Sequence, residues 1–261
     1  SPDTSHDPET DEYLVERFGV DNHYDAKRTN KVYIQERLGL EINPDAPMLF
    51  WPSRLDPVQK GCQLVADILY ALVDHYASEN LQVVFVANGD YQRVFRDIIA
   101  FHKIKKRVAI CDFDFHLEHL GYGAADFILM PSSFEPCGLP QMIAPIYGAL
   151  PVAHDTGGIH DTIIDLDVSR NQGNGFLFNT FDSNGLFWAI RQAMNFYTLP
   201  KNIKHPQIER IMKESAETFT HANTARHYIA LYERMLERPL IVENMQNPDA
   251  CEPGLKPELS R

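Results

Sequence analysis

The chain has 261 residues, of which 44% are hydrophobic and 23% are charged. This composition is ordinary for a globular protein and supplies enough apolar side chains for a sizeable core. The formal net charge of -12 disfavours a protein that binds nucleic acid over a broad surface, since such surfaces are usually basic. A few local cations can still bind a nucleotide. No run approaches about 18 apolar residues, so no membrane contact through a spanning helix is expected.

The cysteines indicate neither a zinc site nor a disulfide framework. Cys62, Cys111, Cys137 and Cys251 lack CxxC spacing and do not cluster with histidine in the sequence. A reducing compartment is the simpler interpretation. The polar N-terminus lacks the apolar region of a signal peptide.

Composition divides the chain into three parts. Residues 1–46 are polar and are predicted to form a linker with a short helix at 31–38 that enters the domain. The segment before this helix is expected to lie over the surface or to be partly disordered. Residues 47–237 are predicted to form the folded domain with its C-terminal helices. Residues 238–261 are predicted to be a tail that adds little to the core.

Short apolar runs alternate with amphipathic stretches in the domain. This alternation predicts an α/β fold, a Rossmann-like parallel sheet flanked by helices, whose ligands bind at the carboxyl ends of the strands. The expected strands are 48–51, 81–87, 108–113, 127–130 and 150–153; the expected helices are 62–76, 91–101, 117–124, 139–148, 186–197, 208–219 and 225–236.

The loop after the first strand carries two cations. Arg54 and Lys60 flank a turn at the carboxyl end of that strand. Fixed cations in this position can bind a diphosphate and stabilise negative charge on a leaving group. The alternative is that both are solvated loop cations, and this segment alone does not decide between the two.

The loop after the fourth strand combines a carboxylate with a helix start. Glu135 precedes Cys137, Gly138 and Leu139, whose N–H groups open the next helix and favour an anion. The alternative for Glu135 is a partner for the helix dipole. Cys137 is expected to be a small buried residue and not a nucleophile, because no adjacent base is visible.

The loop after the fifth strand contains paired glycines. Thr156, Gly157 and Gly158 are predicted to form a second backbone anion pocket next to the Glu135 loop. Asp112 and Asp114 have the spacing of a metal-binding Asp-x-Asp motif, but they end a core strand, so a structural role is favoured and no metal is expected.

The motifs SRLxxxQKG, ADFILMPSSFEPCGLPQ and TGGIHDT resemble, in order and spacing, the C-terminal domain of bacterial glycogen synthases and plant starch synthases. The resemblance covers about residues 7 to 236. It implies the C-terminal half of a GT-B retaining glycosyltransferase, which binds ADP-glucose or UDP-glucose and needs no metal or cofactor. The glucan acceptor would be held by an N-terminal domain that this sequence lacks, so the chain alone is expected to be inactive.

The resemblance also implies roles for the loop residues. Arg54 and Lys60 would bind the diphosphate, and Glu135 would lie close to the glucose. Backbone N–H groups at Cys137, Gly138 and Leu139 would hold the sugar or distal phosphate, Phe113 would stack near the base, and Thr156, Gly157 and Gly158 would line the phosphate side.

Other functions remain as alternatives. One is a GT-B transferase related to sucrose or trehalose-phosphate synthases, which the CGL sequence after Glu135 disfavours. Another is a non-catalytic partner that binds nucleotide or glucan, which the presence of Arg54, Lys60 and Glu135 disfavours. The absence of a GxGxxG sequence after the first strand disfavours a Rossmann dehydrogenase. The expected location is the bacterial cytoplasm or the plastid stroma.

Overall fold

The computed structural model describes Pro2 and residues 5–240. These residues divide into two compact units, the first ending at Thr220 and the second beginning at His221. The second unit contains helix α9 (His221–Leu236), none of whose side chains is buried. The predicted boundaries at 46/47 and 237/238 stay predictions, and residues 241–261 of the predicted tail lie outside the described residues.

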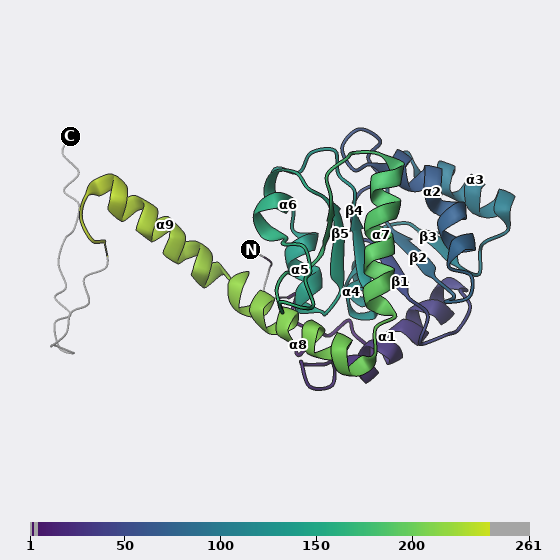
Figure 1. Cartoon of the computed structure of the whole chain (residues 1–261), viewed down its shortest axis with the longest axis horizontal. Coiled ribbons are helices and arrows are strands. Elements are labelled where there is room, and N and C mark those ends of the chain that lie inside the picture. Colours follow the sequence, from purple (N-terminus) through teal and green to yellow (C-terminus); the bar gives the residue numbers. More distant parts are fainter. Residues whose placement is uncertain (1, 3–4, 241–261) are drawn as a thin grey trace, which may run out of the picture. The chain divides into compact units, whose positions relative to one another are not determined.

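The first unit is built on a six-stranded sheet in the order β3-β2-β1-β4-β5-β6, with every pair of neighbours parallel (Figure 1). Its central strand β1 pairs with β2 on one side and with β4 on the other. The strand order therefore reverses beside β1, which is where parallel α/β sheets open a crevice for ligands. The strands are β1 (Met48–Trp51), β2 (Gln82–Val86), β3 (Val108–Cys111), β4 (Phe127–Met130), β5 (Leu150–His154) and β6 (Phe176–Phe178).

Helices cover both faces of the sheet, because successive strand residues point to opposite faces and nearly all are apolar. On one face, Leu49 and Val83 pack in a cluster with residues of α2, α3 and α7. On the other face, Phe50 and Val84 pack with residues of α1, α4 and α5. The helices are α1 (His23–Leu38), α2 (Cys62–His75), α3 (Gln92–His102), α4 (Phe115–Ala124), α5 (Pro140–Ile146), α6 (Gly157–Thr162), α7 (Ser183–Tyr197) and α8 (Lys201–Thr218).

The five predicted strands are present, and a sixth, β6, was missed. It has only three residues and follows a glycine, so the sequence offers no alternating or extended apolar run to reveal it. Helix α8 begins seven residues before its predicted start at 208. Its first turns carry polar residues and an internal proline, Pro206, which hide the helical pattern.

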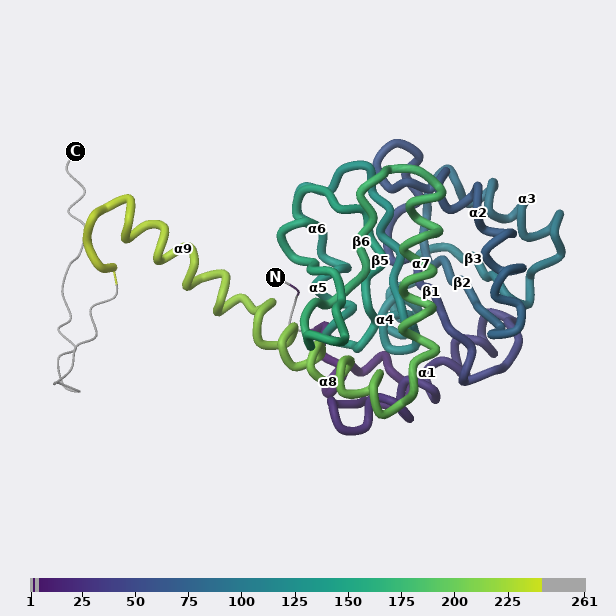
Figure 2. The backbone as a smooth tube through the Cα atoms, viewed as in Figure 1, coloured from purple at the N-terminus to yellow at the C-terminus, as the bar shows by residue number. Residues whose placement is uncertain are grey.

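The expectation that the segment before residue 31 lies over the surface is wrong for the part that the structure describes. Leu14 and Phe18 are buried in the core, and α1 begins at His23 rather than at residue 31. Figure 2 shows this purple segment crossing beneath the sheet next to α8, and α1 and α8 share a cavity. The buried face of α1 is largely polar, including Lys27 and Asn30, so hydrophobic periodicity could not detect it.

Among the described residues, no helix has the length and apolar composition needed to cross a bilayer.

Candidate active site

The loops after β1, β4 and β5 lie together at the carboxyl edge of the sheet. Lys60 follows β1 and Glu135 follows β4, and the distance from Lys60 Nζ to Glu135 Oε2 is 2.5 Å. Both side chains are mostly buried. The contact follows from the pairing of β1 with β4, which brings the carboxyl ends of two distant segments to one edge. Two of the three predicted catalytic residues are therefore in direct contact.

The Lys60 loop is fastened to the loop after β4 through close backbone packing. Gly61 has φ +67°, and a Cβ atom there would overlap the carbonyl oxygen of Pro131, so glycine is required. Ser133 donates its N–H to the Gln59 carbonyl at 2.8 Å. These contacts fix the position from which Lys60 extends.

Asp56 holds the same turn in shape. Its Oδ1 accepts the N–H groups of Gln59 at 2.8 Å and Val58 at 2.9 Å. These bonds, and to a smaller extent the positive charges of Arg54 and Lys60, keep the pKa of Asp56 below its usual value. Asp56 is therefore an ionised carboxylate near neutral pH and offsets part of the positive charge of this loop.

Glu135 is held by a short chain of buried polar groups. The Ser132 hydroxyl donates to Glu135 Oε2 at 3.2 Å, and Nδ1 of His154 donates to the Ser132 carbonyl at 2.8 Å. Ser132 and His154 are both buried. Sequence reasoning assigned a role to neither residue. The sequence feature that could have identified both is a polar residue at, or just after, the carboxyl end of a buried strand.

The paired glycines pack against the Glu135 loop. A Cβ atom at Gly157 would overlap the Glu135 carbonyl, and one at Gly158 would overlap the Cys137 carbonyl. Gly158 also donates its N–H to the Glu135 carbonyl at 2.8 Å, so that group is not available to an anion. The glycines therefore allow two loops to touch, and of the pair Gly157 keeps its N–H unused within the described chain.

A cavity of about 540 Å³ lies beside Arg54 and Phe113. Phe113 is 50% exposed, and Arg54 is exposed without a hydrogen bond or ion pair to another described residue. Asn88, after β2, joins the two walls: its carbonyl accepts the Leu55 N–H at 2.9 Å and its Oδ1 accepts the Phe113 N–H at 2.9 Å. Asn88 was also missed by sequence reasoning, although its loop lies at the expected edge.

Residues 137–139 precede α5 as predicted, and their N–H groups donate to no other described residue. Gly138 has φ +75°, and the Gln141 amide donates to the carbonyls of Cys137 and Gly138. The expectation that Cys137 is buried is wrong, because Cys137 is exposed. This loop contacts the paired glycines through its backbone, which leaves the Cys137 and Leu139 side chains facing solvent.

The Asp-x-Asp pair has structural partners. Asp114 caps α4 by accepting the Leu117 N–H at 2.8 Å. Asp112 accepts from Gln92 at 2.9 Å and from Arg96 at 3.2 Å. Within the part of the chain that the structure describes, no three His, Cys, Asp or Glu side chains are grouped as metal ligands.

Comparison with known proteins identifies the family. The family described as glycosyl transferases group 1 matches residues 46–195. The chain belongs to this family. It is 34% identical over 232 residues to the glycogen synthase of Acholeplasma laidlawii, covering 88% of this chain and 47% of that protein. It is 37% identical over 227 residues to the glycogen synthase of Exiguobacterium sibiricum, covering 86% and 45%.

Solved structures agree with this assignment. The catalytic domain of starch synthase IV from Arabidopsis thaliana, bound to ADP and acarbose, has a TM-score of 0.77 and 32% identity, covering 90% of this chain and 47% of that one. A sucrose-phosphate synthase from Thermosynechococcus elongatus, at 19% identity and a TM-score of 0.57, shares the fold alone. The chain spans about half the length of the glycogen and starch synthases that it matches.

Proposed function

We propose that this chain is the sugar-nucleotide-binding half of a retaining α-1,4-glucan glucosyltransferase that uses ADP-glucose or UDP-glucose. The observation that carries the proposal is the contact between Lys60 and Glu135 at the carboxyl edge of the sheet, next to the cavity lined by Arg54 and Phe113. The likeness to glycogen synthases and to the ADP-bound starch synthase IV supports it.

In this proposal the cations act on the phosphates. Arg54 is exposed at the cavity and free to bind a diphosphate. A lysine ammonium has three N–H donors, so Lys60 can keep its bond to Glu135 and donate to a phosphate oxygen as well. As the glycosidic bond to the nucleotide breaks, negative charge grows on the leaving phosphate, and both cations stabilise that charge more strongly.

Glu135 and the neighbouring backbone would act on the glucose. A carboxylate beside the anomeric carbon stabilises the positive character that the sugar gains in the transition state. The unused N–H groups of residues 137–139 supply hydrogen bonds for the sugar or distal phosphate. Phe113 offers an exposed ring on which a base can stack, with Thr156 and Gly157 on the phosphate side.

The acceptor side of the reaction lies outside these residues. We propose that a further domain of the full protein supplies the contacts to the glucan and closes the cleft against water. A bacterial cytoplasm or plastid stroma, where sugar nucleotides and glucans occur together, remains the proposed location. The reaction needs no metal or cofactor in this scheme.

Calorimetric titration of ADP, UDP and their glucose conjugates into the 261-residue chain tests the proposal. We expect weak binding of at least one of them, with the affinity reduced about tenfold or more by Lys60→Ala. Lys105→Ala is the matched control, since Lys105 is an exposed lysine away from the site. Phe113→Ala should weaken ADP binding while leaving inorganic pyrophosphate binding unchanged.

Two results would contradict the proposal. The first is equal binding of nucleotide by the native chain and the Lys60→Ala variant. The second is a set of nucleotide-induced NMR shift changes that maps away from the loops after β1, β4 and β5.

A further inference from the structure

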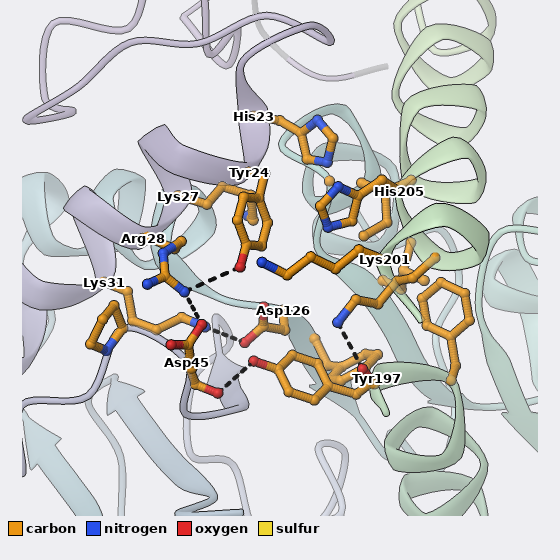
Figure 3. Close-up of a pocket in the computed structure, with 17 residues that line it drawn as sticks. His23, Tyr24, Lys27, Arg28, Lys31, Asp45, Asp126, Tyr197, Lys201 and His205 are labelled. Atoms are coloured by element: carbon orange, nitrogen blue, oxygen red, sulfur yellow. Dashed lines mark hydrogen bonds and ion pairs between the residues drawn. The ribbon is translucent and has the colours of Figure 1, made fainter. Parts of the chain in front are cut away.

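A second cavity lies at the opposite, amino edge of the sheet. It has a volume of about 170 Å³ and is lined by residues of α1, the end of α7 and the start of α8 (Figure 3). Asp126, just before β4, and Leu150, the first residue of β5, also line it. Its lining is strongly basic in a protein with a net charge of -12. The basic lining side chains are Lys27, Arg28, Lys31, Lys201 and Lys204, together with His23 and His205, against the carboxylates Asp45 and Asp126.

Part of this positive charge is used by the fold. Lys31 forms an ion pair with Asp126 at 2.5 Å, and Arg28 pairs with Asp45. Lys27 donates to backbone carbonyls, the nearest being that of Tyr147 at 2.8 Å. These three cations are therefore satisfied by the protein itself and do not by themselves call for a ligand.

The two α8 lysines in the cavity, by contrast, have N–H groups without a hydrogen-bond partner among the described residues. Lys201 lies over the Tyr24 ring at 4.3 Å and forms no hydrogen bond or ion pair with another described residue. Figure 3 shows its side chain extending toward that ring. Lys204 donates once, to the Tyr197 carbonyl at 2.7 Å, which leaves two N–H bonds unused. Both lysines line the same cavity without a carboxylate of their own.

Two buried histidine nitrogens in this cavity also lack partners. His23 is 3% exposed, and its Nδ1 donates to the Val20 carbonyl at 2.7 Å, while its Nε2 has no partner among the described residues. Nε2 of His205, in the neighbouring ring, is likewise buried without a partner. Figure 3 shows the two rings side by side at one end of the cavity. Because Nδ1 of His23 carries the proton, Nε2 of its neutral ring is an acceptor and does not bond to a phosphate oxygen. Nε2 of His205 can carry the proton of its own ring and donate it. A buried donor without a partner is unfavourable, so a ligand that accepts from His205 gains affinity.

We propose that this cavity binds the phosphate group of a small phosphomonoester, held by Lys201 and Lys204 with His205 beside them. A phosphate dianion satisfies two ammonium groups at once through charge-assisted hydrogen bonds. The rings of Tyr24 and Tyr197 form walls for the small organic group of the ester. The volume is below the roughly 300–1,000 Å³ of pockets for drug-sized ligands, which excludes a whole nucleotide. The site is independent of the proposed transferase activity.

Calorimetric titration of inorganic phosphate and of phenyl phosphate into the full chain tests the proposal. We expect both to bind, with phenyl phosphate tighter because its ring contacts Tyr24. The variant Lys201→Ala with Lys204→Ala should bind both ligands about 100-fold more weakly, since it loses two charge-assisted bonds that account for about tenfold each. The matched control, Lys105→Ala with Lys106→Ala, removes two exposed lysines elsewhere and should bind as the native chain does.

Two further measurements show whether the phosphate binds in this cavity or at the proposed transferase site. Lys201→Ala alone changes an exposed side chain without a hydrogen bond, so it tests the site even if the double variant is unstable. Saturation with ADP occupies the proposed transferase site and should leave phosphate binding at this cavity intact. Equal weakening in the Lys105/Lys106 control, loss of binding on ADP saturation, or no binding to the native chain would each overturn the proposal. Equal affinity for phosphate and phenyl phosphate would overturn the phosphomonoester assignment in favour of free phosphate.

Discussion

Lys60 and Glu135 are 75 positions apart in the sequence, yet Nζ of one lies 2.5 Å from Oε2 of the other. Each side chain reaches the contact from a different loop. The two loops are joined by the backbone hydrogen bond from Ser133 to Gln59, by the Ser133 hydroxyl and by the close approach of Gly61 to Pro131. The geometry of the pair is therefore fixed by backbone, so changing either side chain tests its chemistry with little change to the loops.

Alanine substitution of the two members of this pair should affect ADP binding and turnover differently. Lys60→Ala removes a cation from the phosphates and should weaken ADP binding about tenfold or more. Glu135→Ala removes a negative charge from the same place, so ADP binding should hold or tighten. In a full-length enzyme, Glu135→Ala should lower turnover on the order of 100-fold. Calorimetry and turnover on the same variants separate these effects. Equal loss of ADP binding in both variants would mean that the pair only stabilises the fold.

Gly157 should be required for stability both because of its positive φ angle and because its backbone lies against the Glu135 carbonyl. Gly157 has φ +48° and Gly39 has φ +70°, so alanine is strained at both, by about 1 kcal/mol. Only at Gly157 does the new Cβ overlap another residue, the Glu135 carbonyl; nothing lies within 4 Å at Gly39. Gly157→Ala should therefore lower the free energy of unfolding by a further 1–3 kcal/mol or so and weaken ADP binding. Urea denaturation of both variants measures this, and equal losses would contradict it.

The sequence predicted the sheet well because its strands are short, continuous apolar runs between glycine- and proline-containing loops. It also placed the candidate residues at one edge, since the carboxyl ends of parallel strands face the same way. The contact between Lys60 and Glu135 could not be predicted, because it depends on which strands are neighbours and on the shape of two loops. The resemblance to a family supplied roles, whereas the sequence pattern alone left Lys60 as a possible solvated cation.

The prediction for the N-terminal segment was wrong for a different physical reason. Hydrophobic periodicity detects helices that bury apolar side chains, but α1 buries Lys27, Asn30 and Lys31 on its inner face. Asn30, for example, accepts the N–H groups of Val15 and Glu16 and donates to the Glu16 carbonyl. A polar sequence was therefore interpreted as a surface linker, although its polar groups form the contacts that bury it.

Lys27 should stabilise the fold in a pH-dependent way. It donates to the carbonyls of Tyr122, Gly123 and Tyr147, and burial lowers its pKa to about 7. Lys27→Met keeps the apolar stem but leaves these carbonyls without their donor, which should lower the free energy of unfolding by about 2–4 kcal/mol.

The sign of the pH effect follows from proton binding. Between about pH 7 and the unfolded pKa of about 10.4, the unfolded chain holds more protons at Lys27 than the folded chain does. The native chain therefore gains stability as pH rises through this window, by about 1 kcal/mol per pH unit, and Lys27→Met does not. Urea denaturation at pH 7, 8 and 9 should show a widening difference between the two, with Lys105→Met as the control. A constant difference would contradict the prediction.

Asp11 should anchor the N-terminal segment to the core. Its carboxylate accepts from His119 at 2.8 Å and from the Tyr147 hydroxyl at 2.6 Å, both fully or nearly fully buried. Burial raises the pKa of Asp11, but these bonds together lower it below its usual value, so their contribution is present at neutral pH and is lost in acid. Asp11→Ala should lower the free energy of unfolding by about 3 kcal/mol.

The control for Asp11 is Asp7→Ala, since Asp7 Oδ1 accepts only within its own turn, from the Glu9 N–H at 3.0 Å. This variant should change the free energy of unfolding by less than about 1 kcal/mol. Similar small effects in both variants would restore the interpretation of residues 1–30 as a surface linker. Thermal or urea unfolding at pH 7 distinguishes the two results.

The position of β1 between β2 and β4 has a consequence for the order of events during synthesis. β1 can pair with β2 once the residues up to 86 have left the ribosome, but its second neighbour begins only at residue 127. Until β4 pairs with β1, Glu135 is not in place to contact Lys60, and only one side of the crevice is formed. A ribosome-bound fragment that stops before residue 127 would hold a half-built sheet, and acquisition of nucleotide binding would mark the moment at which the two halves of the sheet join.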